Sequence, residues 1–274
     1  MKADEVHEAL RKTGTYETPP EPRRSLLNRL FGNIDAWYFA KLVRIVCSGY
    51  RKALVGKFDD KVWAEHSAMI INAIENCGGR ITISGAENLW NLKKPRVYIA
   101  NHMSMAETFL LPSILLAFGP LTTILKESLI RYPMFGLICQ SIDPIKVGRQ
   151  DPRADLMEVL NKGEQTLKQG RSIFVFPQST RSVVFDVGTF NSLGVKLAAR
   201  GGADVVPVAL KTDYHGIGKF IKEFGPVDMS KPVYVKIGPP ISAGGNQRET
   251  QEQVVRFITD NLKQWGVKIT GGKT

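Results

Sequence analysis

Cysteines, metal-ligand clusters and long apolar runs are scarce in this chain. The three cysteines among 274 residues are scattered, without the spacing of a disulfide framework or a zinc site, so we expect a reducing cytosolic environment and no bound metal. The first twenty residues mix charges with prolines and hold no apolar stretch, and no secretory signal is predicted. The longest uncharged run, residues 108–125, is interrupted by Pro112, Gly119 and Pro120. We predict a buried helix and strand there rather than a membrane span.

Two common catalytic motifs are also missing. The sequence has no G-x-S-x-G, the turn that carries the nucleophile of many serine hydrolases. It also lacks G-x-x-x-x-G-K-[ST], the phosphate-binding loop of many kinases and nucleotide hydrolases. Both classes of enzyme are therefore excluded by motif.

Positive charge is in excess and unevenly distributed. The formal net charge is +11, and residues 22–57 contain eight Lys and Arg against one acid, Asp35. Such a block suits an anionic surface, either a membrane or a nucleic acid, or it forms a solvated helix face. Because these cations lie beside a wide apolar stripe rather than among stacking aromatics in a polar stretch, we favour a membrane and expect no nucleic-acid partner.

The N-terminal quarter is predicted to hold a tail and two helices. Residues 1–22 include Thr-Gly-Thr and Pro-Pro-Glu-Pro and are expected to form a flexible tail. Residues 23–79 carry apolar side chains at helical spacing in two runs, the first with Trp37, Tyr38 and Phe39 beside cations. We interpret the two helices as an amphipathic anchor on the membrane surface. The alternative is that the apolar stripe packs on the protein's own core.

Residues 80–274 alternate short apolar runs with helical stretches. The clearest helix covers residues 152–167, with Asp151 as its N-cap and Pro152 at its first position. Such alternation predicts an α/β fold, a mixed and largely parallel sheet covered by helices. The predicted strands are residues 81–84, 97–100, 121–125, 144–147, 173–176, 205–210 and 233–237.

A histidine and a carboxylate follow the predicted strand 97–100. His102 comes directly after Asn101, and Glu107 lies five residues later at the start of the next helix. An imidazole can take a proton from an alcohol that attacks a carbonyl, and a nearby carboxylate can orient the ring and stabilise the imidazolium. The alternative is a capping box, in which Glu107 bonds back to the Ser104 N–H. A carboxylate has two oxygens, so both roles can coexist.

A second polar turn follows the predicted strand 173–176. Arg181 offers a planar fork suited to a phosphate. The alternative is an ordinary surface turn in which Arg181 pairs with a carboxylate. The neutral hydrogen-bonding residues around it are Gln178, Ser179, Thr180 and Ser182.

Two further histidines carry weaker signals. His66 lies on an apolar helical face and is expected to be a packed side chain. His215 follows the predicted strand 205–210 and is expected either to pack or to line the cleft.

Four blocks of the chain follow one another in a recognisable order: residues 101–107, 145–149, 176–182 and 206–208. They resemble the N-H-x-x-x-x-D, I-P-V-D-R-like, F-P-E-G-T-R-S and V-P-V blocks of the glycerolipid acyltransferases, typified by bacterial 1-acylglycerol-3-phosphate acyltransferase. Residues 125–136 also resemble the family's segment between the first two blocks. The resemblance therefore extends over most of the predicted α/β region.

The resemblance implies an O-acyltransferase of phospholipid biosynthesis over residues 80–274. His102 is expected to deprotonate an acceptor hydroxyl that attacks the thioester of acyl-CoA or acyl carrier protein, with Glu107 orienting His102. The implied acceptor is a lysophospholipid, by default 1-acylglycerol-3-phosphate, and no metal or cofactor other than the acyl donor is implied. The implied location is the cytoplasmic face of a membrane with anionic lipids, as a peripheral protein. The residues implied to bind substrate are Asn101, Lys126, Arg149, Gln178, Ser179, Thr180 and Arg181.

The chain departs from the family's blocks at four positions. Glu107 stands for the usual Asp, Gln178 for Glu, Ser179 for Gly and Gly148 for the common Asp. Changes in a polar site alter selectivity strongly. A different lipid acceptor, or a non-catalytic lipid-binding protein on the same scaffold, therefore stays open as an alternative.

Overall fold

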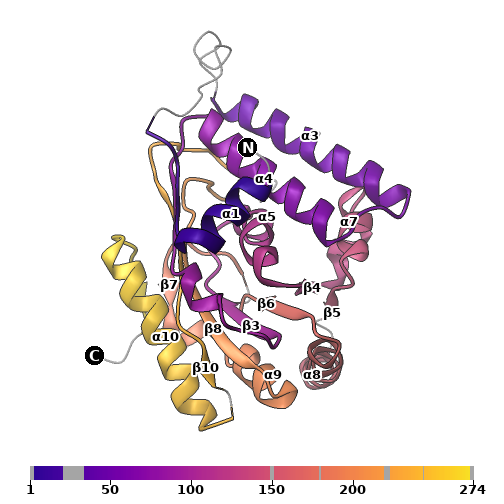
Figure 1. Cartoon of the computed structure of the whole chain (residues 1–274), viewed down its shortest axis with the longest axis vertical. Coiled ribbons are helices and arrows are strands. Elements are labelled where there is room, and N and C mark those ends of the chain that lie inside the picture. The colour runs from indigo at the N-terminus through magenta and orange to yellow at the C-terminus, as the bar shows by residue number, and fades with distance from the viewer. Residues whose placement is uncertain are drawn as a thin grey trace.

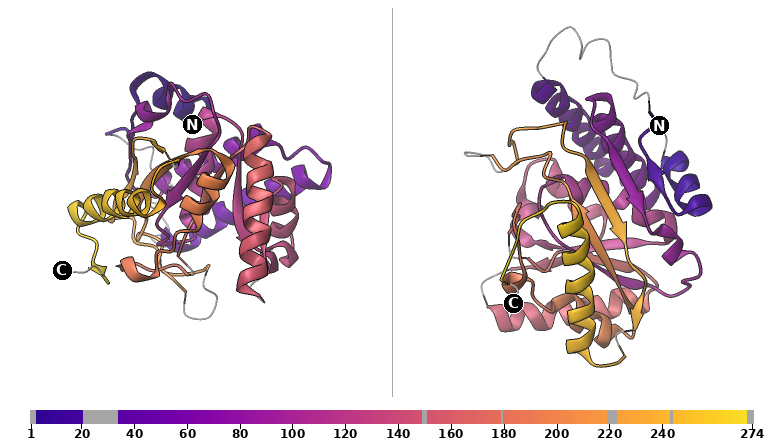
Figure 2. Two further views of the ribbon diagram at one scale, coloured as in Figure 1. Left: turned by 90° about the horizontal axis from the view of Figure 1, so that it is seen from below. Right: turned by 90° about the vertical axis from the view of Figure 1, so that its left-hand side faces the viewer.

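A mixed β-sheet forms the centre of the molecule, with helices on both of its faces (Figures 1 and 2). The computed structural model describes residues 3–20, 34–148, 151–178, 180–218, 223–242 and 244–271. The strands of this sheet are β1 (Tyr16–Glu17), β2 (Ile81–Ser84), β3 (Arg96–Ala100), β4 (Leu121–Lys126), β5 (Ile145–Val147), β6 (Ser172–Val175), β8 (Asp204–Lys211), β9 (Val233–Ile237) and β10 (Ile241–Ser242). A separate parallel pair joins β7 (Phe185–Asp186) to β11 (Ile269–Thr270).

The order of the strands is β1-β2-β9-β8-β3-β6-β4-β5, with β10 beside β8. The run from β8 through β3, β6 and β4 to β5 is parallel, as is the β2–β9 pair. The β1–β2, β8–β9 and β8–β10 pairs are antiparallel. The predicted largely parallel sheet is therefore confirmed. All seven predicted strands are present, with each boundary shifted by at most one residue.

The helices form a layer on each side of the sheet. One layer contains α1 (Ala3–Thr13), α3 (Ile34–Leu54), α4 (Asp60–Asn76), α5 (Ala106–Leu110), α6 (Pro112–Leu115) and α7 (Phe135–Ser141). The other contains α8 (Pro152–Lys168), α9 (Leu193–Gly201) and α10 (Gln247–Gln264). Short 3₁₀ turns are η1 (Ala86–Leu89), η2 (Leu116–Phe118), η3 (Glu127–Arg131) and η4 (Val187–Thr189). The predicted start of α8 is confirmed, because the Asp151 side chain accepts from Arg153 N and Ala154 N.

Strand β3 is buried on both faces because its side chains alternate between two hydrophobic cores. Tyr98 and Ala100 join the cluster beneath α4. Val97 and Ile99 join the cluster beneath α9 and α10. The strand is thus fixed in register, and the loop that follows it starts from a rigid position.

The prediction of a flexible tail over residues 1–22 is wrong for the described residues 3–20. Val6 and Leu10 of α1 are fully buried in the core, and β1 pairs with β2. The Thr18 hydroxyl donates to Glu75 Oε1 at 2.9 Å and ties the segment to α4. Two apolar side chains at an i, i+4 spacing were too short a pattern to predict this packing.

The predicted helical pair is present, but it does not form a module apart from the sheet. Much of α4 is buried, including Ile70, Ile71 and Ile74, which belong to the same cluster as the sheet residues. On α3, Tyr38 and Leu42 of the apolar stripe also pack on this core. Residues 21–33, which include the first part of the predicted stripe and three of its cations, lie outside the described residues.

The uncharged run at residues 108–125 ends α5 and forms α6, η2 and most of β4. Its side chains at Leu110, Leu111, Ile114 and Leu115 are all buried in the core, as predicted. Within the described residues, no helix has the length and apolar character needed to cross a membrane.

Candidate active site

Two loops leave the same edge of the sheet side by side. Strands β3 and β6 are parallel neighbours, with Ile99 opposite Val175. Their carboxyl ends therefore meet at one edge, and the loop after β3 carries His102 while the loop after β6 carries residues 176–182. The two predicted polar turns are brought together by the topology of the sheet.

His102 and Glu107 form a direct pair. The Nδ1 atom of His102 lies 2.6 Å from Glu107 Oε2. Glu107 is fully buried, whereas the His102 side chain keeps 17% of its surface exposed. Among the residues that the structure describes, Nε2 of His102 has no hydrogen-bond partner. A carboxylate on Nδ1 favours the tautomer with the proton there, which leaves the lone pair of Nε2 available to accept a proton.

The second oxygen of Glu107 is held by three donors. Oε1 accepts from the backbone N–H groups of Met103 at 2.8 Å and Ser104 at 3.1 Å. It also accepts from the Thr212 hydroxyl, which in turn accepts from the Ser104 hydroxyl at 2.9 Å. The geometry thus shows both arrangements considered for Glu107. One oxygen bonds back to Ser104 as in a capping box, and the other bonds the imidazole.

The loop after β6 holds the backbone of His102 from both ends. The His102 N–H donates to Gln178 Oε1 at 2.7 Å, and Ser182 N donates to the His102 carbonyl at 3.0 Å. The ring of Phe176 stacks on the imidazole, with centroids 4.2 Å apart and planes inclined by 14°. Gln178 is buried. The side-chain oxygen of Gln178 therefore holds the backbone of His102 and so helps to position the imidazole. The sequence analysis expected Gln178 to bind substrate and did not predict this contact.

Asn101 also has a structural partner. Its side-chain amide donates to the Leu210 carbonyl and accepts from Leu210 N, both at 2.8 Å. The side chain is buried. These paired bonds fasten the end of β3 to β8 and give Asn101 a positioning role. The expectation that Asn101 binds substrate stays a prediction.

The remaining expected substrate-binding residues divide into two groups. Lys126, Thr180 and Arg181 are described: Lys126 ends β4 and is exposed, and Thr180 is exposed. The Arg181 Nη2 atom donates to Glu223 Oε1 at 2.9 Å, which is the carboxylate pairing considered as the alternative. Arg149 and Ser179 lie outside the described residues. The expectation that Arg149 binds substrate therefore stays a prediction.

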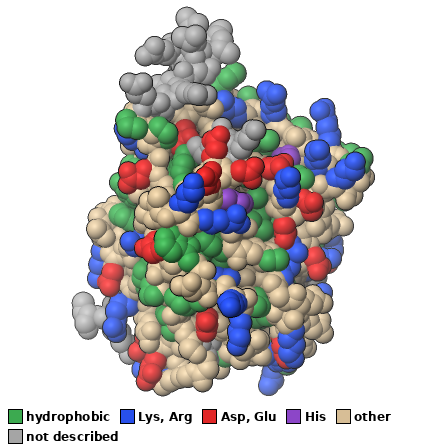
Figure 3. Space-filling view, viewed as in Figure 1, with side chains coloured by type: hydrophobic (Ala, Val, Ile, Leu, Met, Phe, Trp, Pro, Cys, Tyr) green, Lys and Arg blue, Asp and Glu red, His purple; other side chains and the backbone are tan. Residues whose placement is uncertain are grey.

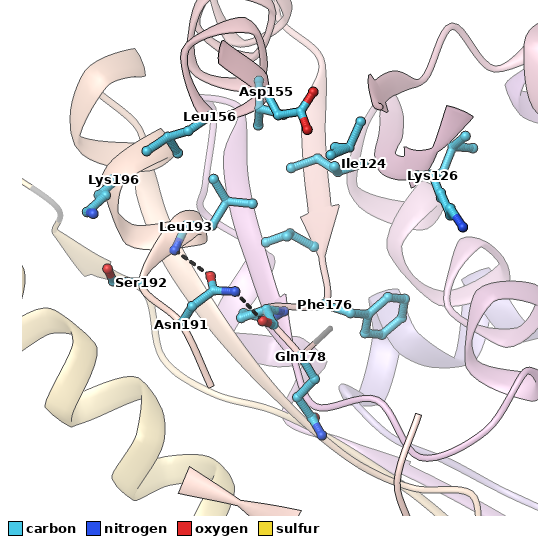
Figure 4. Close-up of a pocket in the computed structure, with 15 residues that line it drawn as sticks. Ile124, Lys126, Asp155, Leu156, Phe176, Gln178, Asn191, Ser192, Leu193 and Lys196 are labelled. Atoms are coloured by element: carbon cyan, nitrogen blue, oxygen red, sulfur yellow. Dashed lines mark hydrogen bonds between the residues drawn. The ribbon is translucent and has the colours of Figure 1, made fainter. Parts of the chain in front are cut away.

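A cavity of about 510 Å³ adjoins this edge of the sheet. Its wall is largely apolar, with Ile124, Leu156, Val159 and Leu193, and Lys126 lies at its margin. Figure 4 shows Phe176 and Gln178 at one end of the cavity and Asp155 and Leu156 at the other. Phe176, which stacks on His102, forms part of the wall, whereas the imidazole itself does not line the cavity.

The two weaker histidines are both packed. His66 lies buried on α4, with Nδ1 2.8 Å from the Val62 carbonyl. His215 is 1% exposed and surrounded by Tyr38, Phe39 and Tyr214. Burial lowers the pKa of His215.

Comparisons with known proteins agree with the sequence blocks. Residues 80–211 match the family model described as Acyltransferase. A 1-acyl-sn-glycerol-3-phosphate acyltransferase of Pseudomonas aeruginosa is 33% identical over 168 residues, which are 61% of this chain and 62% of the relative. The chloroplastic 1-acyl-sn-glycerol-3-phosphate acyltransferase LPAT1 of Arabidopsis thaliana is 30% identical over 74% of this chain and 56% of its own length. Over residues 80–211 the chain is therefore similar to the acyltransferase family.

A solved acyltransferase has the same fold. The 1-acyl-sn-glycerophosphate acyltransferase PlsC of Thermotoga maritima superimposes with a TM-score of 0.64 at 21% identity, over 88% of this chain and 97% of that structure. The chain spans about 60% of the length of the two curated relatives named above. The matched residues 80–211 include all four sequence blocks, and with them His102, Glu107 and Gln178.

The sequence analysis did not identify three residues of this site. Phe176 stacks on His102, Thr212 bonds Glu107, and Glu223 pairs with Arg181. A signal existed for Thr212, because it directly follows a strand of the same sheet and therefore lies at the same edge as His102. Nothing in the sequence indicated that Glu223 returns to this edge from a later loop.

Proposed function

We propose that the protein is an O-acyltransferase of phospholipid biosynthesis that moves a fatty acyl chain from acyl-CoA or acyl carrier protein to the hydroxyl of a lysophospholipid, by default 1-acylglycerol-3-phosphate. The observation that carries the proposal is the pair in which Glu107 holds Nδ1 of His102 on a ring that stays partly exposed. The names of the relatives, all 1-acyl-sn-glycerol-3-phosphate acyltransferases, support the same acceptor.

The reaction that fits this pair is a direct transfer. Nε2 of His102 takes the proton of the acceptor hydroxyl as its oxygen attacks the thioester carbonyl. Glu107 keeps Nδ1 protonated and stabilises the imidazolium that forms. Collapse of the tetrahedral intermediate breaks the carbon–sulfur bond, and the imidazolium returns its proton to the departing thiolate. The products are an ester and a free thiol.

The cavity beside Phe176 suits the acyl chain. Its volume of about 510 Å³ falls within the range of pockets that bind small ligands, and its wall is mostly apolar. Substituting Leu156 by Trp is expected to fill part of it and shift the preferred acyl donor to shorter chains, measured with a series of acyl-CoA lengths. Met157, exposed one position along α8, gives the matched control, Met157→Trp, which should leave the profile unchanged. A chain-length profile that Leu156→Trp does not alter would place the acyl chain elsewhere.

The proposed activity is tested with an acceptor panel. Purified protein receives one labelled acyl-CoA, or the corresponding acyl carrier protein, together with lysophospholipids of different headgroups. Lipid mass spectrometry identifies the product, and a thiol reagent follows release of the free thiol. Transfer to 1-acylglycerol-3-phosphate is expected. Absence of thioester turnover with every acceptor and both donors would contradict the proposal and leave lipid binding without catalysis.

The outer face of α3 supports a peripheral position on the cytoplasmic face of a membrane with anionic lipids. Leu54 and Val55 are 57% and 64% exposed at the end of this helix. Arg44, Arg51 and Lys52 are exposed on it, and Figure 3 shows Lys and Arg side chains gathered over α3. Apolar side chains flanked by cations suit the interface of an anionic bilayer.

Point substitutions test this contact, since α1, β1 and α3 are part of the core and their removal would disturb the fold. Leu54→Glu/Val55→Glu is expected to weaken sedimentation with phosphatidylglycerol vesicles by about tenfold or more, because each inserted side chain contributes roughly 1.5–3 kcal/mol. Met157→Glu on α8, an exposed apolar residue on the other helical layer, is the control and should bind as the wild type does. Equal binding of all three proteins would exclude the end of α3 as the membrane contact.

A further inference from the structure

The imidazole of His102 lies flat on an aromatic ring. The centroids of His102 and Phe176 are 4.2 Å apart and their planes are inclined by only 14°, so the ring face of Phe176 covers one face of the imidazole. Glu107 meets the same imidazole at Nδ1. The proposed base therefore has a carboxylate at its edge and the π-electron cloud of a phenyl ring on its face.

The position of the Phe176 ring is set by the strand before it and the turn after it. Phe176 directly follows β6, and Pro177 restricts the backbone of the residue before it to extended conformations. The Pro177 carbonyl accepts from the Asn191 amide. Phe174, which is buried, meets the Phe176 ring edge-on, with centroids 5.7 Å apart and planes at 79°. The ring plane is therefore held by the sheet and the turn, independently of the imidazole.

The face of a phenyl ring attracts a cation because it is the negative side of the ring quadrupole. A neutral imidazole gains little from this field, whereas the imidazolium formed by proton transfer gains more. The Phe176 ring is partly buried, and the His102 side chain is 17% exposed, so water screens the attraction less than at an open surface. The contact therefore acts on the protonated base, which exists only after the acceptor hydroxyl has given up its proton.

We propose that Phe176 assists the proton transfer by stabilising the His102 imidazolium through its ring face, in addition to the carboxylate of Glu107. The inference rests on the proposed function and deepens it. The acceptor hydroxyl gives its proton to Nε2, and the positive charge of the ring then lies between the carboxylate and the phenyl face. When the imidazolium returns the proton to the departing thiolate, the charge and the attraction disappear together. The contact thus contributes to kcat rather than to the binding of either substrate.

The test replaces Phe176 by phenylalanine analogues that carry one, two and three ring fluorines, introduced by nonsense-codon suppression. Fluorine withdraws electron density from the ring face with little change in size, so the attraction for a cation falls stepwise while the stacking and the cavity wall are kept. With acyl-CoA and 1-acylglycerol-3-phosphate, kcat is expected to fall with each fluorine. The trifluoro ring should lower it by about two- to thirtyfold, the usual strength of a cation–π contact. KM for both substrates should change little.

Phe58 gives the matched control. Its ring lies beside another histidine, His66, with centroids 5.7 Å apart, but His66 is buried on α4 and has no part in the proposed reaction. Trifluorophenylalanine at position 58 should leave kcat unchanged. A kcat that does not depend on the number of fluorines at position 176 would overturn the inference, as would an equal fall at positions 58 and 176. A rise in KM for the acyl donor at constant kcat would show that Phe176 is only a wall of the cavity.

An NMR titration separates this inference from the proposed activity. If the wild type turns over no thioester with any acceptor, the proposed function fails, but proton uptake by the His102 ring still tests the contact. The charged groups around this ring, Glu107 and the Arg181–Glu223 pair, are the same in all variants. With the trifluoro ring at position 176, His102 should take up its proton at a pH lower by about 0.3 to 1.5. An unchanged titration of His102 would contradict the role given to Phe176.

Discussion

Glu107 reaches Nδ1 of His102 at 2.6 Å although the resembled acyltransferase block carries a shorter aspartate at this position. The extra methylene is accommodated because the carboxylate divides its two oxygens. Oε1 is held by the Met103 and Ser104 N–H groups and the Thr212 hydroxyl, which leaves Oε2 for the imidazole. The departure at Glu107 is therefore compatible with a working base and does not favour a non-catalytic protein.

Glu107→Gln is expected to reduce kcat by about 100-fold or more with little change in KM. The amide keeps the volume but loses the charge that stabilises the imidazolium, and general base catalysis is commonly worth about 10²–10⁴-fold. Glu107→Asp keeps the charge but cannot hold all four partners, so an intermediate kcat is expected. Steady-state kinetics of both variants check this, and a fully active Glu107→Gln would remove the carboxylate from the mechanism.

Thr212→Val is expected to lower kcat and to destabilise the protein. The substitution keeps the shape but leaves Glu107 Oε1 and the Ser104 hydroxyl each without one buried partner. A lost hydrogen bond to a buried charged group costs about 1.5–3 kcal/mol in the free energy of unfolding. Thr212→Ser retains the hydroxyl and should restore kcat. Urea unfolding measures the stability, and a variant that loses stability but keeps wild-type kcat would show that Thr212 is only structural.

Gln178→Glu is expected to retain kcat within a few-fold, whereas Gln178→Ala should lose most of it. A carboxylate oxygen can accept the His102 N–H as the amide oxygen does at 2.7 Å, while alanine leaves this buried N–H without its partner. Measuring kcat of the two variants under the same conditions, with circular dichroism to check folding, tests this prediction. If both variants were equally inactive, the amide N–H₂ group of Gln178 and not its oxygen would be the important one.

The stability of the protein is expected to fall between about pH 7 and pH 5. Burial lowers the pKa of both His215 and His7, whereas an unfolded imidazole titrates near about 6.5. In this range the unfolded state binds protons that the folded state does not, so acidification favours unfolding, and the effect levels off below the folded pKa values. His215→Gln keeps a side-chain N–H for the Glu223 carbonyl but does not titrate. Urea unfolding at several pH values should show that the free energy of unfolding of this variant depends less steeply on pH. His7→Gln is expected to have the same effect. If neither variant changed the pH dependence, the two buried histidines would not be its cause.

Much of the fold was predictable because the strands that build the sheet are short apolar runs separated by helices. The same topology brings the His102 loop and the Arg181 loop together, since β3 and β6 are parallel neighbours. The packing of α1 was not predictable, because Val6 and Leu10 are meaningful only against a core assembled from distant segments. The interpretation of α4 as part of a membrane anchor was wrong for the same reason. From sequence alone, a helix that is apolar on most sides cannot be told from an anchor, because the sheet on which it packs is not known.

Hydrogen-bond and ion-pair partners that are distant in the sequence could not be predicted from motifs. The roles of Gln178 and Asn101 depend on which backbone groups of His102 and Leu210 lie within hydrogen-bond reach. Glu223 meets Arg181 from a later loop, and His215 bonds the backbone carbonyl of Glu223. Motif spacing carries no information on such contacts, which are set by the tertiary structure.

The most direct test of the proposed mechanism is kcat of His102→Ala, measured as thiol release from acyl-CoA in the presence of 1-acylglycerol-3-phosphate. Truncation leaves the buried Glu107 Oε2 without its partner, so some loss of stability is expected, and circular dichroism must show that the variant is folded at the assay temperature. We predict that kcat falls by about 100- to 10,000-fold, the usual contribution of a general base. A folded His102→Ala protein with wild-type kcat would contradict the account.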